Sequence, residues 1–234
     1  MPSITTRSLD RAFIERNEIH YNSEWWWKKW RIDVGALIYH TALYSNPNAT
    51  VHTVAELNAL DSSVESIIVD TNGCDDQSFT VLNLTRFMNL RVLEIGDYSF
   101  TYVKEVYMTG LSKLESVIIG RDCFRVMDSA NTYDDKLQFH LRDCASLREL
   151  EIGYRSFYWY GVCEIDNLPS LETIDIGVMG AVSKNFAYAS LELKSESEKR
   201  EWGIDMPQLK SLAIGNDAFS YGMLAVFESD SWYA

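Results

Sequence analysis

Residues 90–100 read Leu90-Arg-Val-Leu93-Glu-Ile95-Gly96-Asp-Tyr-Ser-Phe100, and later stretches of the chain repeat this pattern. The copies follow the form LxxLxIGxxxF, with conservative replacements, at Leu114 to Phe124, Leu147 to Phe157 and Leu209 to Phe219. A partial copy from Leu171 to Gly177 lacks the closing Phe, and a diverged copy from Val64 to Val69 lacks the Gly. The sequence therefore predicts about six repeat units, whose positions we number 1 to 11 from the first Leu.

The spacing of the copies points to a known class of repeat. The Ile-Gly pairs begin at residues 95, 119, 152, 176 and 214, so steps of 24, 33, 24 and 38 residues separate them. A period near 24 is thus interrupted twice by insertions, and repeats of roughly 20 to 29 residues are leucine-rich repeats. One unit cannot bury its apolar positions 1, 4, 6 and 11 alone, so the units must stack. We expect a repeat solenoid over residues 61–234, with a parallel β-sheet on its concave side.

A second apolar couple with a period of two residues precedes most copies. The couples are Leu82 and Leu84, Val106 and Met108, Phe139 and Leu141, and Cys163 and Ile165. Such alternation predicts a short second strand in each unit, so the coils should be β-rich rather than backed by helices. The recurrent Gly at position 7 is interpreted as a bend with unusual φ at the strand exit; close approach of a ligand backbone is the alternative.

Residues 1–60 are expected to form a helical N-terminal cap or extension. Thr53 to Glu56 match a capping box that opens a short helix. Further upstream, apolar residues recur at helical spacing from Trp27 to Thr41, as an end cap of a solenoid requires. The alternative is a docking or membrane-surface helix that uses Trp25, Trp26 and Trp30.

Two stretches carry the resemblance to a known family. Ile214-Gly-Asn-Asp-Ala-Phe219 contains an IGxxAF element, and Ile95-Gly-Asp-Tyr-Ser-Phe100 is close to it. These residues resemble the BspA-like branch of the leucine-rich repeat superfamily, and the resemblance covers roughly residues 60–230. It implies recognition of a protein or a glycan, and it supplies no shared catalytic residues.

Position 2 alternates in charge along the chain. It holds Glu65, Arg91, Glu115, Arg148, Glu172 and Lys210. Parallel strands lie about 4.8 Å apart, so stacked units would place each of these side chains between two opposite charges. The alternation predicts an ion-pair ladder on the surface.

The outward positions 3, 5 and 8 would form the concave surface. Its middle is acidic and rich in hydroxyl groups, which suits a basic or polar protein partner. The candidate partner-binding residues are Glu94, Arg121, Glu149, Glu151, Tyr154 and Asp175. The inserted loops around Val126 to Lys136 and Val178 to Gly203 are further candidates for binding.

The composition and the motifs argue against several functions. A net charge of −13 disfavours nucleic acid and anionic membranes as partners. The four cysteines, Cys74, Cys123, Cys144 and Cys163, form no CxxC pair and are interpreted as reduced core thiols. The sequence has no phosphate loop, nucleophile elbow or metal-ligand spacing, so we expect neither an enzyme nor a cofactor or metal.

The favoured function is a noncatalytic protein-interaction scaffold. The alternatives are a cell-surface recognition or adhesion module for glycan or host protein, and a subunit docked through its Trp-rich helix. Without a secretory h-region or an apolar segment of membrane-spanning length, a cytoplasmic location is the default expectation and a surface location stays open. Ala225-Val-Phe227 starts a coil that the chain leaves incomplete, which predicts an open edge and self-association.

Overall fold

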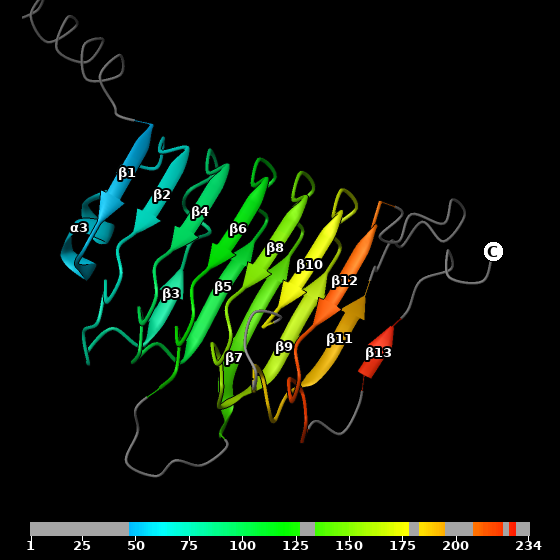
Figure 1. The fold of residues 1–234 in the computed structure, drawn as a ribbon. Coiled ribbons are helices and arrows are strands. Elements are labelled where there is room, and N and C mark those ends of the chain that lie inside the picture. Colours follow the sequence, from blue (N-terminus) through cyan, green and yellow to red (C-terminus); the bar gives the residue numbers. More distant parts are fainter. Residues whose placement is uncertain (1–46, 127–133, 178–182, 195–207, 222–224, 228–234) are drawn as a thin grey trace, which may run out of the picture. The chain divides into compact units, whose positions relative to one another are not determined.

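The computed structural model describes residues 47–126, 134–177, 183–194, 208–221 and 225–227. Two parallel β-sheets dominate this part of the chain (Figure 1). Sheet A contains β1 (Asn48–Val51), β2 (Ser66–Val69), β4 (Val92–Ile95), β6 (Ser116–Ile119), β8 (Glu149–Ile152), β10 (Thr173–Ile176) and β12 (Ser211–Ile214), in that order. Sheet B contains β3 (Val81–Asn83), β5 (Glu105–Thr109), β7 (Asp134–Arg142), β9 (Tyr160–Asp166), β11 (Ser190–Lys194) and β13 (Ala225–Phe227). The expectation of a β-rich chain with parallel sheets is confirmed.

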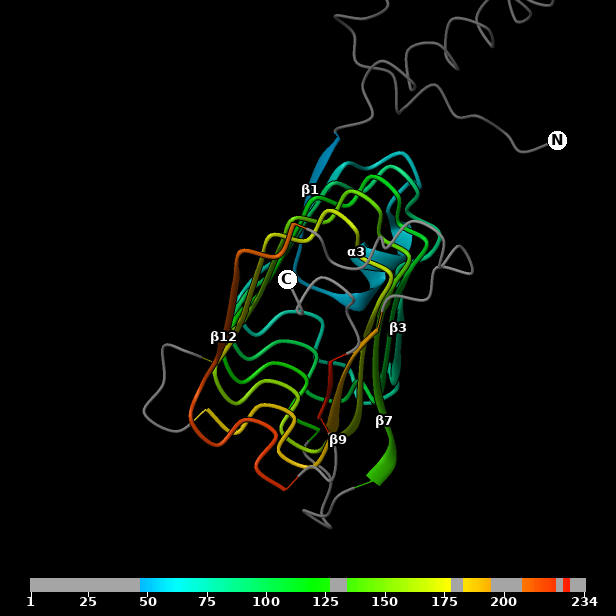
Figure 2. The same ribbon diagram turned by 90° about the vertical axis from the view of Figure 1, so that its right-hand side faces the viewer.

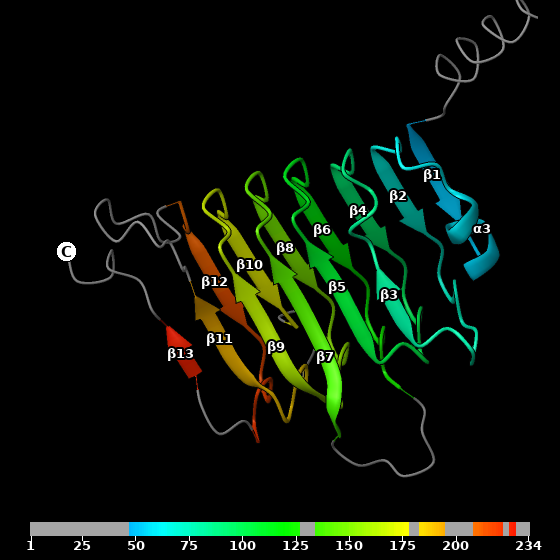
Figure 3. The same ribbon diagram turned by 180° about the vertical axis from the view of Figure 1, so that it is seen from behind.

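From β2 onward, successive strands of the chain belong alternately to the two sheets, which lie on opposite sides of the core (Figure 2). The strands of sheet A come from the first half of each sequence copy, and they pair in register. Position 4 of one copy lies opposite position 4 of the next, from Ile67 and Leu93 through to Ile174 and Leu212. The apolar couples form the strands of sheet B, seen from behind in Figure 3, so the prediction of a second strand is confirmed.

Alternation of burial along each strand defines the core between the sheets. In β4, β6 and β8 every second residue is buried, as a strand with one solvated face requires. Position 11 adds a stack of nearly parallel rings, with centroid separations of 5.2 Å from Phe100 to Phe124 and 4.5 Å from Phe124 to Phe157. The stack continues through Phe186 to Phe219.

Phe186 corrects the prediction that the fifth copy lacks its closing aromatic residue. It stacks on Phe157 at 4.8 Å and on Phe219 at 5.5 Å, which is the place of position 11. Residues 178–185 separate it from Gly177, whereas only three residues separate Gly96 from Phe100, so sequence spacing hid its equivalence. The predicted second insertion, residues 178–203, is also too long, because it contains β11 (Ser190–Lys194), a strand of sheet B.

The position-7 glycines have a different role from the one expected. A Cβ atom on Gly96 would lie 2.5 Å from the Thr71 backbone nitrogen, and one on Gly153 would lie 2.5 Å from the Gly120 carbonyl carbon. Of these glycines, Gly177 alone has a positive φ, at 74°. The interpretation as a bend is therefore wrong for the others: the residue must be small because the backbone of the preceding copy packs against it.

Positions 9 and 11 adopt the left-handed conformation that was assigned to the glycine. Tyr98 and Phe100 have φ values of 60° and 57°, and Arg155 and Phe157 have values of 60° and 58°. Between them, position 10 is buried and binds the preceding copy: Ser156 Oγ donates to the Gly120 carbonyl at 2.7 Å, and Asn185 Nδ2 donates to the Gly153 carbonyl at 2.7 Å. These bonds tie the side chain at position 10 to the backbone of the preceding copy.

The N-terminal side of the described region contains α3 (Val54–Ala59). Thr53 Oγ1 accepts a hydrogen bond from the Glu56 amide at 3.2 Å, and Glu56 Oε2 accepts one from the Thr53 amide, also at 3.2 Å, so the capping box is confirmed. β1 precedes this helix and was not predicted. The expected Trp-rich helix, with Trp25, Trp26 and Trp30, lies outside the described residues.

At the other side, β12 and β13 are the outermost strands of the described sheets. Self-association through this end stays a prediction. No helix in the described ranges is both long enough and apolar enough to cross a membrane.

Candidate binding face on sheet A

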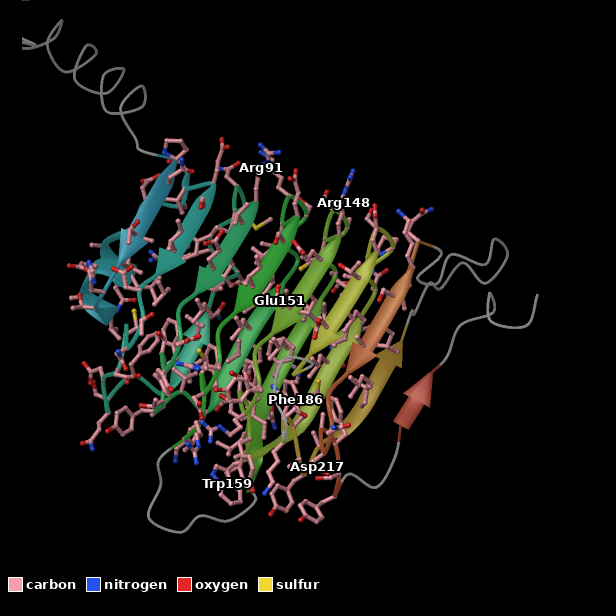
Figure 4. The ribbon with its side chains drawn as sticks, in the orientation of Figure 1. Arg91, Arg148, Glu151, Trp159, Phe186 and Asp217 are labelled. Carbon is pink, nitrogen blue, oxygen red and sulfur yellow. The ribbon has the colours of Figure 1, made fainter. Side chains whose placement is uncertain are left out.

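The exposed face of sheet A consists of side chains at positions 3 and 5. Each strand turns its position 4 and position 6 side chains into the core, so positions 3 and 5 point outward. Glu94, Glu149 and Glu151 are exposed, and Asp175 is half-buried. Figure 4 shows Glu151 in the middle of this face. The outward orientation predicted for these four residues is confirmed.

Three of the four carboxylates gather on adjacent strands. Glu151 on β8 lies directly opposite Asp175 on β10, and Glu149 is two residues before Glu151 on the same strand. Ser116 Oγ donates a hydrogen bond of 3.0 Å to Glu149. Glu94 is separate, because it lies on β4 and Ile118 of β6 stands between it and Glu151. We call Glu149, Glu151 and Asp175 the acidic patch.

Beyond the carboxyl ends of β4, β6 and β8, arginine and tyrosine side chains interlock. Arg121 Nε lies 3.0 Å from Asp97 Oδ2, and Arg121 Nη1 donates to the Tyr154 hydroxyl at 3.1 Å. The guanidinium carbon of Arg121 is 5.3 Å from the Tyr98 ring centroid and 5.9 Å from that of Tyr154. These contacts raise the pKa of Arg121, chiefly through the Tyr154 hydrogen bond. Arg121 and Tyr154 are thus brought together, as their shared position 8 suggested.

The ion-pair ladder at position 2 is formed in part. Arg91 lies 2.9 Å from Glu115, and Lys210 lies 2.7 Å from Glu172. The hydrogen bond with Glu115 raises the pKa of Arg91, and the one with Lys210 lowers the pKa of Glu172. The ladder lies at the beginning of the sheet A strands, where Figure 4 labels Arg91 and Arg148. Arg121 instead follows the end of β6. Because the side chains are exposed, each pair contributes only about 0 to 1 kcal/mol.

The outward face of sheet B carries a polar network that the sequence did not reveal. His140 Nδ1 lies 2.5 Å from Glu164 Oε2, and its Nε2 lies 3.1 Å from Gln138 Oε1. The imidazole ring stacks on Tyr107 at 5.1 Å. Arg142 extends the network, with contacts of 3.4 Å to Glu164 and 3.2 Å to Asp166.

His140 occupies an outward position of β7, where the sequence by itself predicts an ordinary surface histidine. Tyr107, His140 and Glu164 are the middle residues of three successive apolar couples and pair in register. That shared position was the signal in the sequence from which the network could have been inferred.

A second row of aromatic rings follows the edge near position 11. Trp159 stacks on Tyr188 at 5.6 Å, and Tyr188 stacks on Tyr221 at 5.1 Å. Tyr158 meets Trp159 edge to face, and Lys184 Nζ lies 5.8 Å from the Tyr158 ring centroid. Figure 4 shows Trp159 and Asp217 at the edge opposite Arg91.

The cysteines are buried and free. Burial raises the pKa of Cys74 and Cys144 to about 11 and that of Cys123 to about 12, so these thiols are poor nucleophiles. Within the described ranges, no group of three or more His, Cys, Asp and Glu side chains is arranged to hold a metal ion.

The geometry of the face therefore offers charged and aromatic groups for contact with a partner. In comparisons with known proteins, no family model, no curated protein and no solved structure matches the chain.

Proposed function

We propose that the chain is a leucine-rich-type repeat solenoid that binds a protein partner through the exposed face of sheet A without catalysing a reaction. The observation that carries this proposal is the register of sheet A, which repeats outward positions 3 and 5 from strand to strand. The result is a continuous surface with fixed spacing, on which a partner can contact several units at once.

The acidic patch supports a basic partner. Glu149, Glu151 and Asp175 lie on neighbouring strands, and a group of carboxylates attracts Lys or Arg side chains of a partner. A basic segment therefore fits the middle of the face. The resemblance to BspA-like repeats supports the same role, since recognition is the common task of that superfamily.

Selection of peptides on the immobilised protein tests the proposal. Random peptides displayed on phage are enriched on the wild-type chain, and the winners are measured by fluorescence polarisation. We expect sequences rich in Lys and Arg. Their Kd should rise about tenfold in E149Q/E151Q/D175N, because three charged contacts are lost together.

A matched control separates the patch from the net charge. The variant E65Q/D143N/D217N removes three exposed carboxylates outside the middle of the face, so its net charge equals that of the patch variant. It should bind the selected peptides within about twofold of wild type. Equal weakening by the two variants, or selected peptides without basic residues, would contradict a basic partner on this face.

A further inference from the structure

Three guanidinium groups gather next to the proposed binding face, and we call Arg121, Arg125 and Arg155 the arginine cluster. Arg125 Nη1 lies 3.2 Å from Asp122 Oδ1, and Arg155 Nη2 lies 2.6 Å from Asp122 Oδ2. The Asp122 side chain is only 1% exposed, so one buried carboxylate forms ion pairs with two arginines. The arginines themselves stay about 40% exposed, at 44%, 43% and 39%.

Aromatic rings hold two members of the cluster in place. The Tyr154 ring centroid is 5.9 Å from the guanidinium carbon of Arg121 and 5.3 Å from that of Arg155. Tyr98 provides a second ring for Arg121 at 5.3 Å. Side chains ordered in advance lose less conformational entropy on binding, and Arg and Tyr are the residues on which binding energy concentrates at interfaces.

The cluster keeps donors available for a ligand. A guanidinium group has five N–H donors, and Asp97 and Asp122 together supply only two carboxylates to three arginines. In a chain of net charge −13, these three arginines and their two aspartates leave a local excess of one positive charge.

The planar fork of a guanidinium matches a carboxylate in two-point contact. Arg125 and Arg155 share one anchoring carboxylate, while Arg121 is anchored separately by Asp97. Two anchored positions fit two carboxylates of one extended segment better than they fit a single anion. An extended chain places alternate side chains about 7 Å apart on one side.

We propose that the arginine cluster binds an acidic peptide segment of a protein partner, with carboxylates on Arg121 and on the pair Arg125 and Arg155. This inference deepens the proposed function, because it adds an acidic contact at the strand ends to the basic contact at the acidic patch. The partner then carries a basic segment and an acidic segment, and their opposite charges set the direction in which it lies across sheet A.

A labelled peptide of alternating Glu and Gly tests the acidic contact directly. Fluorescence polarisation at low salt should show binding to the full chain, and the peptide with Gln in place of Glu should not bind. We expect R121Q/R125Q to weaken binding at least about tenfold, since each lost contact is a charge-assisted hydrogen bond. Both residues are exposed, and Arg155 stays in place to hold Asp122.

The control is R91Q/R148Q, which removes two arginines at the opposite ends of the strands (Figure 4). It should bind the Glu peptide within about twofold of wild type. Equal weakening by the two variants would overturn the proposal, because binding would then follow net charge. Binding of a phosphoserine peptide without binding of the Glu peptide would overturn it as well.

A third variant separates this inference from the proposed function. E149Q/E151Q/D175N should lose basic peptides and still bind the Glu peptide. If basic peptides fail to bind wild type while the Glu peptide binds, the acidic patch is refuted as a site and the arginine cluster stands. Loss of Glu-peptide binding in this variant would overturn the assignment to the arginine cluster.

Discussion

At the scale of single residues, burial determines the reactivity of the cysteine thiols. Cys123 occupies position 10 of its copy, and Cys144 follows the end of β7 by two residues. Both side chains are buried, so neither thiol is exposed to water. Burial disfavours the thiolate, which is why the pKa values rise to about 12 and about 11. The four cysteines are therefore packing residues within the described structure.

The raised pKa values predict how stability depends on pH. In the unfolded chain the thiols ionise near pH 8.5, whereas the folded thiols of Cys74 and Cys144 ionise near pH 11. The stabilisation is complete below the lower value and is lost as the pH rises toward the higher one. We expect the urea midpoint to fall between pH 9 and pH 11.

Thiol labelling checks the same assignment. At pH 8 a disulfide reagent should label the native protein roughly 100-fold more slowly than the unfolded protein, because so little thiolate is present. Fast labelling of a single cysteine in the native chain would show that its burial is wrong.

At the scale of the strands, the close approach of neighbouring backbones restricts which residues can occupy positions 7 and 10. The backbone around position 7 contacts the preceding copy, and position 10 donates to that copy's position-7 carbonyl group. Asp70 stands at position 7 of the first copy, which has no earlier copy before it and has β1 as its neighbour. Its side chain instead reaches His52 at 2.7 Å.

Substitution of one glycine measures this contact. Gly153→Ala places a Cβ atom 2.5 Å from the carbonyl carbon of Gly120, so the strands must move apart. We expect the free energy of unfolding to fall by about 3 kcal/mol. Gly110→Ala is the control, since its Cβ meets no atom within 4 Å and the φ of 72° alone should cost about 1 kcal/mol. Similar losses in the two variants would contradict the close approach.

In the described molecule as a whole, stability should fall from the middle toward β12. Leu150 and Ile152 of β8 are buried between neighbours on both sides, whereas Leu212 of β12 is half-buried and Ile214 is 39% exposed. Within the described residues, β12 pairs with β10 alone. A strand with one neighbour lacks half of the contacts between strands that a strand in the middle of a sheet makes.

Amide hydrogen exchange followed by mass spectrometry tests this gradient. We expect peptides that cover β12 to exchange at least about tenfold faster than peptides that cover β6 and β8, because local opening requires breaking fewer contacts. Equal protection of β8 and β12 from exchange would contradict the lower stability expected of β12.

Sequence pattern alone was enough to predict β2 to β10 and β12, because buried positions 4 and 6 and the apolar couples recur with the period of two residues that a strand has. It did not predict β1 or β11. It was also enough for the capping box at Thr53, since both hydrogen bonds join residues three apart. The acidic character of the exposed face of sheet A could also be predicted, because equal positions of successive sequence copies pair with each other.

Contacts across copies needed the tertiary structure. Phe186 joins the ring stack nine residues after Gly177, whereas Phe157 follows Gly153 by four, so spacing alone does not show the equivalence. Arg125 and Arg155 lie 30 residues apart and meet on Asp122, and His140 meets Glu164 from the neighbouring strand of sheet B.

The physical reason is that some features depend on consecutive residues and others depend on residues far apart in the sequence. Hydrophobic periodicity is a property of one strand and is written in consecutive residues. Ion pairs, ring stacks and the clash behind each position-7 glycine depend on atoms of another copy, so they exist only once the sheets have formed.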